Sequence, residues 1–197
     1  MPGNSESLFR EIKAEGLTFD LGLLAWWPTL IKPVLINCAV HGFINFHPSL
    51  LPHNRGKHYN FWALAEGEPF GVTLHFVDEG VDSGDIVVQQ EIAYDWTDTG
   101  GTLYRKAQRE MVQLFCETYP MFRILDIPRK AQNLSEGSFH LAKELDQASH
   151  IDLEREYKAR QLLNLLRART FSGHPACWFE DKGEKYEVRI DIKRIDR

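Results

Sequence analysis

Two polar side chains occupy alternate positions in a short apolar segment, residues 42–48 (GFINFHP). If this segment forms a strand, Asn45 and His47 project from the same face, where apolar side chains are the rule. Asp82 follows a second β-rich segment, in a glycine-rich loop. A carboxylate beside an imidazole holds its tautomer and stabilises its charged form. The three groups together favour acyl transfer, because the amide can stabilise an oxyanion while the acid–imidazole pair moves protons.

Each of these residues, taken singly, also has an ordinary structural interpretation. A lone strand histidine is more often structural than catalytic, and an aspartate in such a loop is usually a turn residue. No activated nucleophile accompanies the group, because the sequence has no GxSxG motif and its cysteines lie elsewhere. Direct attack by an external amine would need no nucleophile from the protein.

The composition is that of an ordinary globular protein. Of 197 residues, 43% are hydrophobic and 26% charged, which suits one domain with its own core. No apolar run approaches the roughly 20 residues that cross a bilayer, and the start contains no signal-peptide segment, so we expect a soluble, cytoplasmic protein. Three widely spaced cysteines predict neither a disulfide framework nor a metal site. A formal charge of −5 disfavours a general nucleic-acid partner.

Strands and helices are expected to alternate along most of the chain. The predicted strands cover residues 20–27, 42–48, 71–80 and 86–94. The predicted helices cover residues 5–15, 30–38, 58–66, 99–119 and 152–169. Pro120 is expected to bend or end the fourth helix, Trp26 to lie in the core, and residues 126–150 to form loop with short structure. With a hairpin over residues 177–192, this order predicts an α/β sheet with an α+β tail.

Two longer strings surround the polar residues, INFHPSLLPHNRG (44–56) and GVTLHFVDEGVDSGDIV (71–87). Together they resemble the signature of the folate-dependent formyltransferases, an Asn-x-His followed by Ser-Leu-Leu-Pro and then an aspartate in a turn of a hydrophobic residue, Asp, one of Ser, Thr or Gly, and Gly, which reads Val81-Asp82-Ser83-Gly84 here. The resemblance extends from about Asp20 to about Leu125, and more weakly through the tail. It implies a three-layer, Rossmann-like sheet in a catalytic core over residues 1–125, followed by a helix and β-hairpin extension over residues 126–197.

The same resemblance implies a reaction and the residues that carry it. The formyl donor would be N10-formyltetrahydrofolate, the acceptor a primary amine, and no metal would be needed. Asn45 and His47 would bond the formyl oxygen, and Asp82 would orient His47. The folate would lie against Trp27, Pro28, Thr29, Ile31, Val77, Asp78, Glu79, Gly80 and Val81, mainly through their backbone.

The acceptor side is most similar to that of nucleotide-sugar N-formyltransferases. The likeness lies in residues 53–75, 99–107 and 162–188, and it implies a nucleotide-linked amino-deoxysugar as acceptor. The residues expected to meet its sugar or diphosphate are Ser49, Asn54, Arg55, Lys57 and Tyr59. The C-terminal hairpin could serve a homodimer.

Other functions remain open at this point. The acceptor could be another amine, as in the methionyl-tRNA and glycinamide ribonucleotide enzymes. The acidic net charge and the short tail disfavour methionyl-tRNA, and the lack of an early glycine-rich loop disfavours glycinamide ribonucleotide. Hydrolysis of formyl-folate and a non-catalytic, folate-binding or interaction role are further alternatives. Relatives begin with a strand–helix–strand section before the position of Asp20, so we expect a shortened sheet, either truncated or completed by partner contacts.

Overall fold

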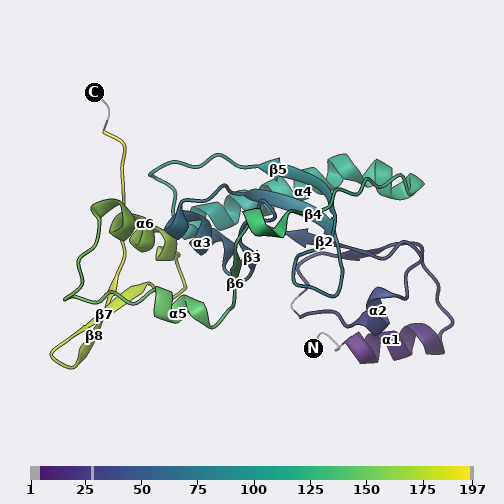
Figure 1. The fold of residues 1–197 in the computed structure, drawn as a ribbon, viewed down its shortest axis with the longest axis horizontal. Helices are drawn as coiled ribbons and strands as arrows, with labels where there is room; N and C mark the ends of the chain where they lie inside the picture. Colours follow the sequence, from purple (N-terminus) through teal and green to yellow (C-terminus); the bar gives the residue numbers. More distant parts are fainter. Residues whose placement is uncertain (1–4, 28, 196–197) are drawn as a thin grey trace.

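The structure is a computed structural model that describes residues 5–27 and 29–195. At its centre lies a four-stranded sheet in the order β1-β2-β4-β5 (Figure 1), built from Gly22–Leu24 (β1), Phe43–His47 (β2), Gly71–Phe76 (β4) and Ile86–Glu91 (β5). β1 and β2 run parallel, whereas β2 with β4 and β4 with β5 are antiparallel. The predicted α/β class is therefore confirmed, in the form of a mixed sheet with helices around it.

Helices and two smaller ladders surround this sheet. The helices are Ser5–Ala14 (α1), Pro33–Ile36 (α2), Tyr59–Glu66 (α3), Gly100–Ile124 (α4), Glu144–Ala148 (α5) and Ala159–Arg169 (α6), with a 3₁₀ turn at Leu134–Glu136. The small ladders pair Arg55–Gly56 (β3) with Phe139–His140 (β6), and Cys177–Asp181 (β7) with Glu184–Val188 (β8). In Figure 1 α1 and α2 lie at one end of the molecule, and α6 and the hairpin at the other. None of the helices in the described ranges is long and apolar enough to span a membrane.

The two faces of β2 serve different purposes. Ile44 and Phe46 point into the main hydrophobic core, which also holds the buried stripe of α4. Phe43 belongs to a second cluster formed with α1 and α2. Because side chains alternate along a strand, Asn45 and His47 share the face of Phe43, opposite α4. The sheet thus buries one face and leaves polar groups on the other.

Helix α4 is longer than the sequence predicts. Thr99 caps its first turn, accepting a hydrogen bond from the Thr102 amide. Of the two effects expected of Pro120, a bend or an end, the second is wrong, because the helix continues through it to Ile124. Phe122 lies in the core cluster, and its packing holds the last turn in place. Tertiary packing therefore outweighs the local cost of the proline.

Other elements are shorter than predicted: β4 ends at Phe76, β5 ends at Glu91 and α2 covers only Pro33–Ile36. For two more, the structure shows the reason. The strand expected over residues 20–27 is ordered as a strand only at Gly22–Leu24, because Trp26 turns the chain with a φ of 51°. The helix expected over residues 152–169 begins at Ala159. The residues before it are tied elsewhere, since the Ile151 amide donates to the carbonyl oxygen of Trp178 at 2.8 Å.

Candidate active site

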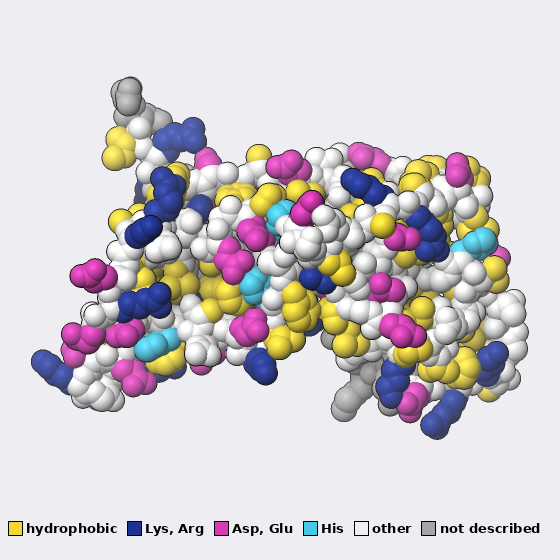
Figure 2. Space-filling view, viewed as in Figure 1, with side chains coloured by type: hydrophobic (Ala, Val, Ile, Leu, Met, Phe, Trp, Pro, Cys, Tyr) yellow, Lys and Arg dark blue, Asp and Glu magenta, His cyan; other side chains and the backbone are white. Residues whose placement is uncertain are grey.

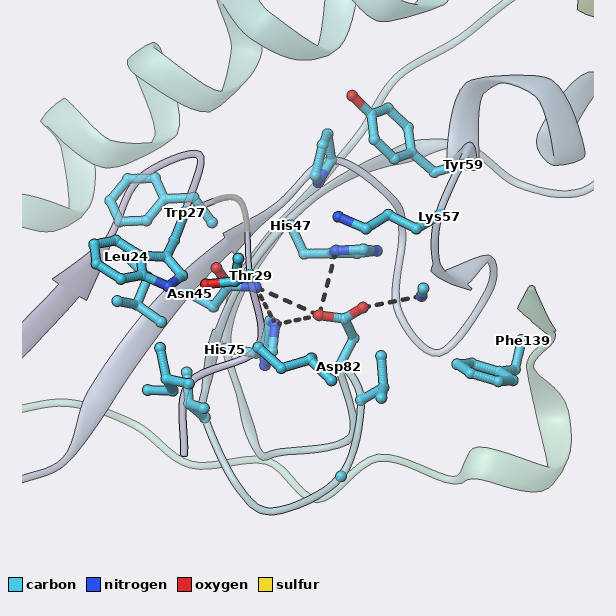
Figure 3. A pocket seen from close by; sticks show the side chains of 18 of the residues that line it. Leu24, Trp27, Thr29, Asn45, His47, Lys57, Tyr59, His75, Asp82 and Phe139 are labelled. Atoms are coloured by element: carbon cyan, nitrogen blue, oxygen red, sulfur yellow. Dashed lines mark hydrogen bonds and ion pairs between the residues drawn. The ribbon is translucent and has the colours of Figure 1, made fainter. Parts of the chain in front are cut away.

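A pocket of about 570 Å³ opens on the polar face of the sheet. Its walls come from β1 and the residues that follow it, from the ends of β2 and β4 with their loops, and from residues 139–142. Figure 3 shows the side chains of Asn45, His47, His75 and Asp82 converging within it. The three residues singled out by the sequence are thus brought together, and a fourth joins them.

The register of β2 and β4 places two of these side chains directly opposite each other. Asn45 pairs with His75, and His47 pairs with Thr73. Cross-strand neighbours on one face of an antiparallel pair lie about 5 Å apart at Cβ, so their polar ends can touch. The amide nitrogen of Asn45 lies 3.2 Å from Nε2 of His75.

The loop after β4 brings Asp82 to the same point. Asp82 has a left-handed backbone, with φ at 51°, a conformation that aspartate and asparagine adopt more readily than most residues. Gly84 lets the loop lie against β4, because a Cβ at that position would stand 2.0 Å from the carbonyl oxygen of Phe76. The glycine-rich sequence around Asp82 is therefore required by a close backbone approach.

One carboxylate oxygen of Asp82 lies close to nitrogen atoms of three side chains. Its Oδ1 lies 3.5 Å from Nδ1 of His47, 3.4 Å from Nδ2 of Asn45 and 3.6 Å from Nε2 of His75 (Figure 3). Its Oδ2 accepts a hydrogen bond from the Gly56 amide at 2.9 Å. Both oxygens are therefore surrounded by nitrogen atoms, which is the environment of an ionised carboxylate.

The balance of forces keeps Asp82 charged. Burial alone would raise the pKa of Asp82, whose side chain is 14% exposed. The imidazoles of His47 and His75 and the Gly56 amide together lower that pKa by more, so it lies well below its usual range. Asp82 is therefore an acceptor over the whole physiological range of pH.

His47 is held between two acceptors. Its Nδ1 faces Asp82, and its Nε2 lies 3.3 Å from the backbone oxygen of Asn54. Burial lowers the pKa of His47, and the charge of Asp82 opposes this without reversing it. The imidazole is therefore neutral at pH 7, and a proton that reaches either ring nitrogen finds an oxygen beside it.

The burial of His47 predicts a pH dependence of stability. Because its pKa is lowered on folding, the unfolded chain binds a proton below about pH 6.5 that the folded protein does not. The free energy of unfolding should then fall as the pH drops below that value, by up to about 1.4 kcal/mol per pH unit for this group. Denaturant unfolding of the wild type and His47→Asn between about pH 5 and 8 measures the slope, which should be shallower in the variant.

The control for this measurement is His41→Asn, since His41 is exposed on the surface. It should keep the wild-type slope. A His47→Asn protein whose unfolding free energy follows the wild-type pH dependence would mean that His47 titrates alike in the folded and unfolded chain.

His75 is the site residue that the sequence reasoning missed. Its Nδ1 lies 2.8 Å from the carbonyl oxygen of Phe76, which fixes the direction of the ring. Its Nε2 lies between the amide nitrogen of Asn45, at 3.2 Å, and Oδ1 of Asp82, at 3.6 Å. His75 thereby orients Asn45, and the signal for it was available as a histidine in the middle of an apolar strand, in step with Thr73.

The apolar end of the pocket holds most of the residues expected to meet the folate. The structure places seven of them in the pocket wall, namely Trp27, Thr29, Ile31, Val77, Asp78, Gly80 and Val81. Glu79 is exposed and is not part of this wall, and Pro28 lies outside the described residues. Trp26 was expected in the core, but it is 49% exposed and lines the pocket.

Only part of the expected acceptor set reaches the pocket. Lys57 and Tyr59 line it, and the ring of Tyr59 meets that of His47 edge-on at 6.1 Å. Ser49 and Asn54 are fully buried, so they have no surface to offer a substrate. Arg55 does not line the pocket, and its guanidinium lies over the ring of Phe139 instead.

Four residues of the wall come from the stretch expected to be mostly loop. Phe139, His140, Leu141 and Ala142 close the side of the pocket next to Lys57. They are placed there by pairing of β6 with β3, a contact across more than eighty residues of chain that no local pattern signals. Among the described residues, no group of three or more metal-ligating side chains is placed to hold an ion.

Comparison with known families matches two regions of the chain. Residues 5–119 match the model of the formyl transferase family. Residues 144–194 match the N-formyltransferase dimerization C-terminal domain. The first match contains all four polar residues that converge in the pocket, Asn45, His47, His75 and Asp82.

Individual relatives agree with these matches. A dTDP-4-amino-4,6-dideoxyglucose formyltransferase from Mycobacterium tuberculosis is 31% identical over 151 residues, which are 76% of this chain and 64% of that protein. The chain thus aligns with less than two thirds of the length of such curated relatives. The crystal structure of a 4-N formyltransferase from Francisella tularensis superimposes with a TM-score of 0.88 at 27% identity, covering 98% of this chain and 78% of that one.

A further solved structure carries ligands. The formyltransferase PseJ from Anoxybacillus kamchatkensis, in complex with UDP-4,6-dideoxy-4-formamido-L-AltNAc and tetrahydrofolate, is 33% identical, with a TM-score of 0.60. That match covers 66% of this chain and 68% of PseJ.

Proposed function

The chain belongs to the formyl transferase family, and from this premise we propose that it transfers a formyl group from N10-formyltetrahydrofolate to the primary amine of a nucleotide-linked amino-deoxysugar. The observation that carries the proposal is the convergence of Asn45, His47 and Asp82 in one pocket. Two relatives support this choice of acceptor. The Mycobacterium tuberculosis protein is named as the formyltransferase of a dTDP-linked amino sugar, and PseJ was solved in complex with a UDP-linked formamido sugar.

The pocket suits a folate at its apolar end. Trp27 and Val77 lie in this wall, and they offer flat and aliphatic surfaces to a ring. The indole nitrogen of Trp27 is buried and has no partner among the described residues. When bound there, the donor would supply an activated formyl carbon for attack by the amine.

The chain's own groups would then handle charge and protons. Asn45 Nδ2 would donate to the oxygen on which negative charge develops. His47, with Asp82 at its Nδ1, would take the proton released by the attacking amine, and the protonated ring would then donate to the same oxygen. As the bond between the formyl carbon and N10 breaks, that proton would pass to N10 of the departing tetrahydrofolate. The present contacts of 3.2–3.6 Å are long, as is common before a substrate binds, and would tighten around it.

Lys57 is the cation best placed to meet the acceptor. It lines the pocket on the side of Phe139, away from the folate end. An ammonium group on a flexible stem suits the oxygens of a diphosphate. Figure 2 shows Lys and Arg side chains scattered among acidic ones on the face in view. Among the described residues Lys57 is the one Lys or Arg that lines the pocket, so a single local cation would recognise the substrate there.

We also propose the setting of the reaction. The C-terminal region would join two copies in a homodimer, supported by the match of residues 144–194 to a dimerization domain and by the half-exposed Tyr186 on the hairpin. The division into a core and an extension near residue 125 is supported by the end of α4 at Ile124. A cytoplasmic location agrees with three free thiols, Cys38, Cys116 and Cys177.

The test is a formyl-transfer assay with the purified chain. N10-formyltetrahydrofolate is combined with dTDP- and UDP-linked amino-deoxysugars, and mass spectrometry follows the formamido product. Formation of that product, with folate release that depends on the amine, is the expected result. Folate release without any amine would indicate hydrolysis, and folate binding without release would indicate a non-catalytic protein; both outcomes contradict the proposal.

A further inference from the structure

The two family matches leave residues 120–143 between them, and part of this segment lies against the active site. We call residues 130–142 the strap. At its start Lys130 exchanges two backbone hydrogen bonds with Ile86, at 2.8 and 3.0 Å. At its end β6 pairs with β3, so the strap crosses the molecule from the Asp82 loop to the loop after His47.

Gln132 clamps the Asp82 loop. Its Nε2 donates to the carbonyl oxygens of Asp82 at 3.0 Å and of Gly84 at 2.6 Å. These two carbonyls belong to the turn that begins at Asp82, whose left-handed backbone persists only when its surroundings fix it. The side chain of Gln132 therefore holds the backbone from which the Asp82 carboxylate projects.

Ser138 clamps the second loop in the same way. Its Oγ accepts from the Asn54 amide at 2.9 Å and donates to Glu68 at 2.7 Å. Asn54 is also left-handed, with φ at 55°, and its carbonyl oxygen is the one that faces His47. Between the two clamps Gly137 lies so close to Pro52 that a Cβ would stand 2.0 Å from its carbonyl oxygen.

We propose that the strap is a positioning element of the active site, in which Gln132 holds Asp82 and Ser138 holds Asn54, the backbone partner of His47. Neither residue touches the pocket, so each acts through the groups it holds. The inference rests on the proposed function for its kinetic consequences, but the geometry that it describes is independent of the substrate.

The first test replaces Gln132 by methionine, which keeps its length and removes the donor. We expect kcat to fall about 10- to 100-fold, since misplacement of a reacting group is costly, while KM for donor and acceptor stays nearly unchanged. Gln132→Glu, which puts an acceptor beside two carbonyl oxygens, should be at least as impaired. Gln113→Met on the exposed face of α4 is the matched control and should keep the wild-type kcat.

A second readout does not depend on turnover. Carbon-13 NMR of the Asp82 carboxyl follows its titration, with His47 on β2 and His75 on β4 as the ionisable groups that face it. In the wild type Asp82 should stay ionised until the protein unfolds in acid; in Gln132→Met it should titrate before unfolding, because the contacts that lower its pKa are loosened. Thermal unfolding of both proteins shows whether the fold is intact.

The second clamp is tested with a pair of serines from the strap. Ser138→Ala removes the acceptor of the Asn54 amide, and we expect kcat to fall about three- to tenfold. Ser135→Ala is the control, because Ser135 is exposed and its hydroxyl bonds Asn133. Equal kcat values for the two serine variants would remove Ser138 from the inference.

The outcomes separate this inference from the proposed function. A Gln132→Met protein with the wild-type kcat, or with the wild-type Asp82 titration, overturns the inference. A wild type that transfers no formyl group to any acceptor overturns the proposed function instead, and the carboxyl titration then decides the positioning by itself.

Discussion

Replacing Asp82 by asparagine is expected to lower formyl transfer about a thousandfold, within the range that acid–base groups contribute. Asparagine keeps the size of the side chain and accepts the left-handed backbone of this position. It removes the charge that faces Nδ1 of His47 and turns one of the two acceptor oxygens into a donor. His47 would then lose the group that holds its proton, and steady-state kinetics would show the loss mainly in kcat.

The matched control is Asp85→Asn, three residues further along the same loop. Asp85 is partly exposed, and its contact with Arg129 is long, at 3.8 Å. Such surface pairs contribute little to stability, so this variant should fold and turn over like the wild type. If Asp82→Asn retained the activity of Asp85→Asn, the catalytic assignment of Asp82 would have to be withdrawn.

Replacing Gly84 by alanine is expected to be the most damaging small change in the site. The added Cβ would stand 2.0 Å from the carbonyl oxygen of Phe76 and 2.8 Å from its carbon, so the loop would have to move away from β4. Backbone atoms cannot turn aside as a side chain can, and we expect a loss of about 3 kcal/mol of stability, at the upper end for overpacking. The displaced loop would also carry Asp82 away from His47, so activity should fall together with stability.

Gly16→Ala provides the comparison for this variant. Gly16 follows α1, and an added Cβ there meets no atom within 4 Å, although its φ of 62° still costs alanine about 1 kcal/mol. Chemical unfolding and formyl transfer measured on both variants separate a general glycine effect from the contact at Phe76. A Gly84→Ala protein as stable and active as Gly16→Ala would show that the loop can accommodate a Cβ at position 84, which would contradict the close approach to Phe76.

The polar face of the sheet could be predicted because its information is local. Asn45 and His47 lie two residues apart on one strand, and alternation alone puts them on one face. The glycines around Asp82 likewise predict a tight loop. Predicting His75 as a site residue also requires the antiparallel register that sets it opposite Asn45. That register depends on which strand pairs with β2, and the residues around Asn45 do not indicate this.

The far wall of the pocket could not be predicted for the same reason. Phe139 lines the pocket only because β6 pairs with β3. Ser49 and Asn54 do not line it, because their side chains are fully buried. Pro120 illustrates the opposite failure, in which a correct local rule is overruled by the packing of Phe122. For Phe139 and Asn54 the deciding contact lies more than eighty residues away along the chain.

The strap has a consequence for how such chains can be recombined. Its contacts with Asp82 and Asn54 join a stretch between the two matched regions to the catalytic loops, whereas the hairpin beyond it makes its own small core with α6. A chimera that exchanged everything after residue 125 with a relative would import a foreign strap against native loops. An exchange that begins after Ala142 would keep the strap together with the loops that it holds.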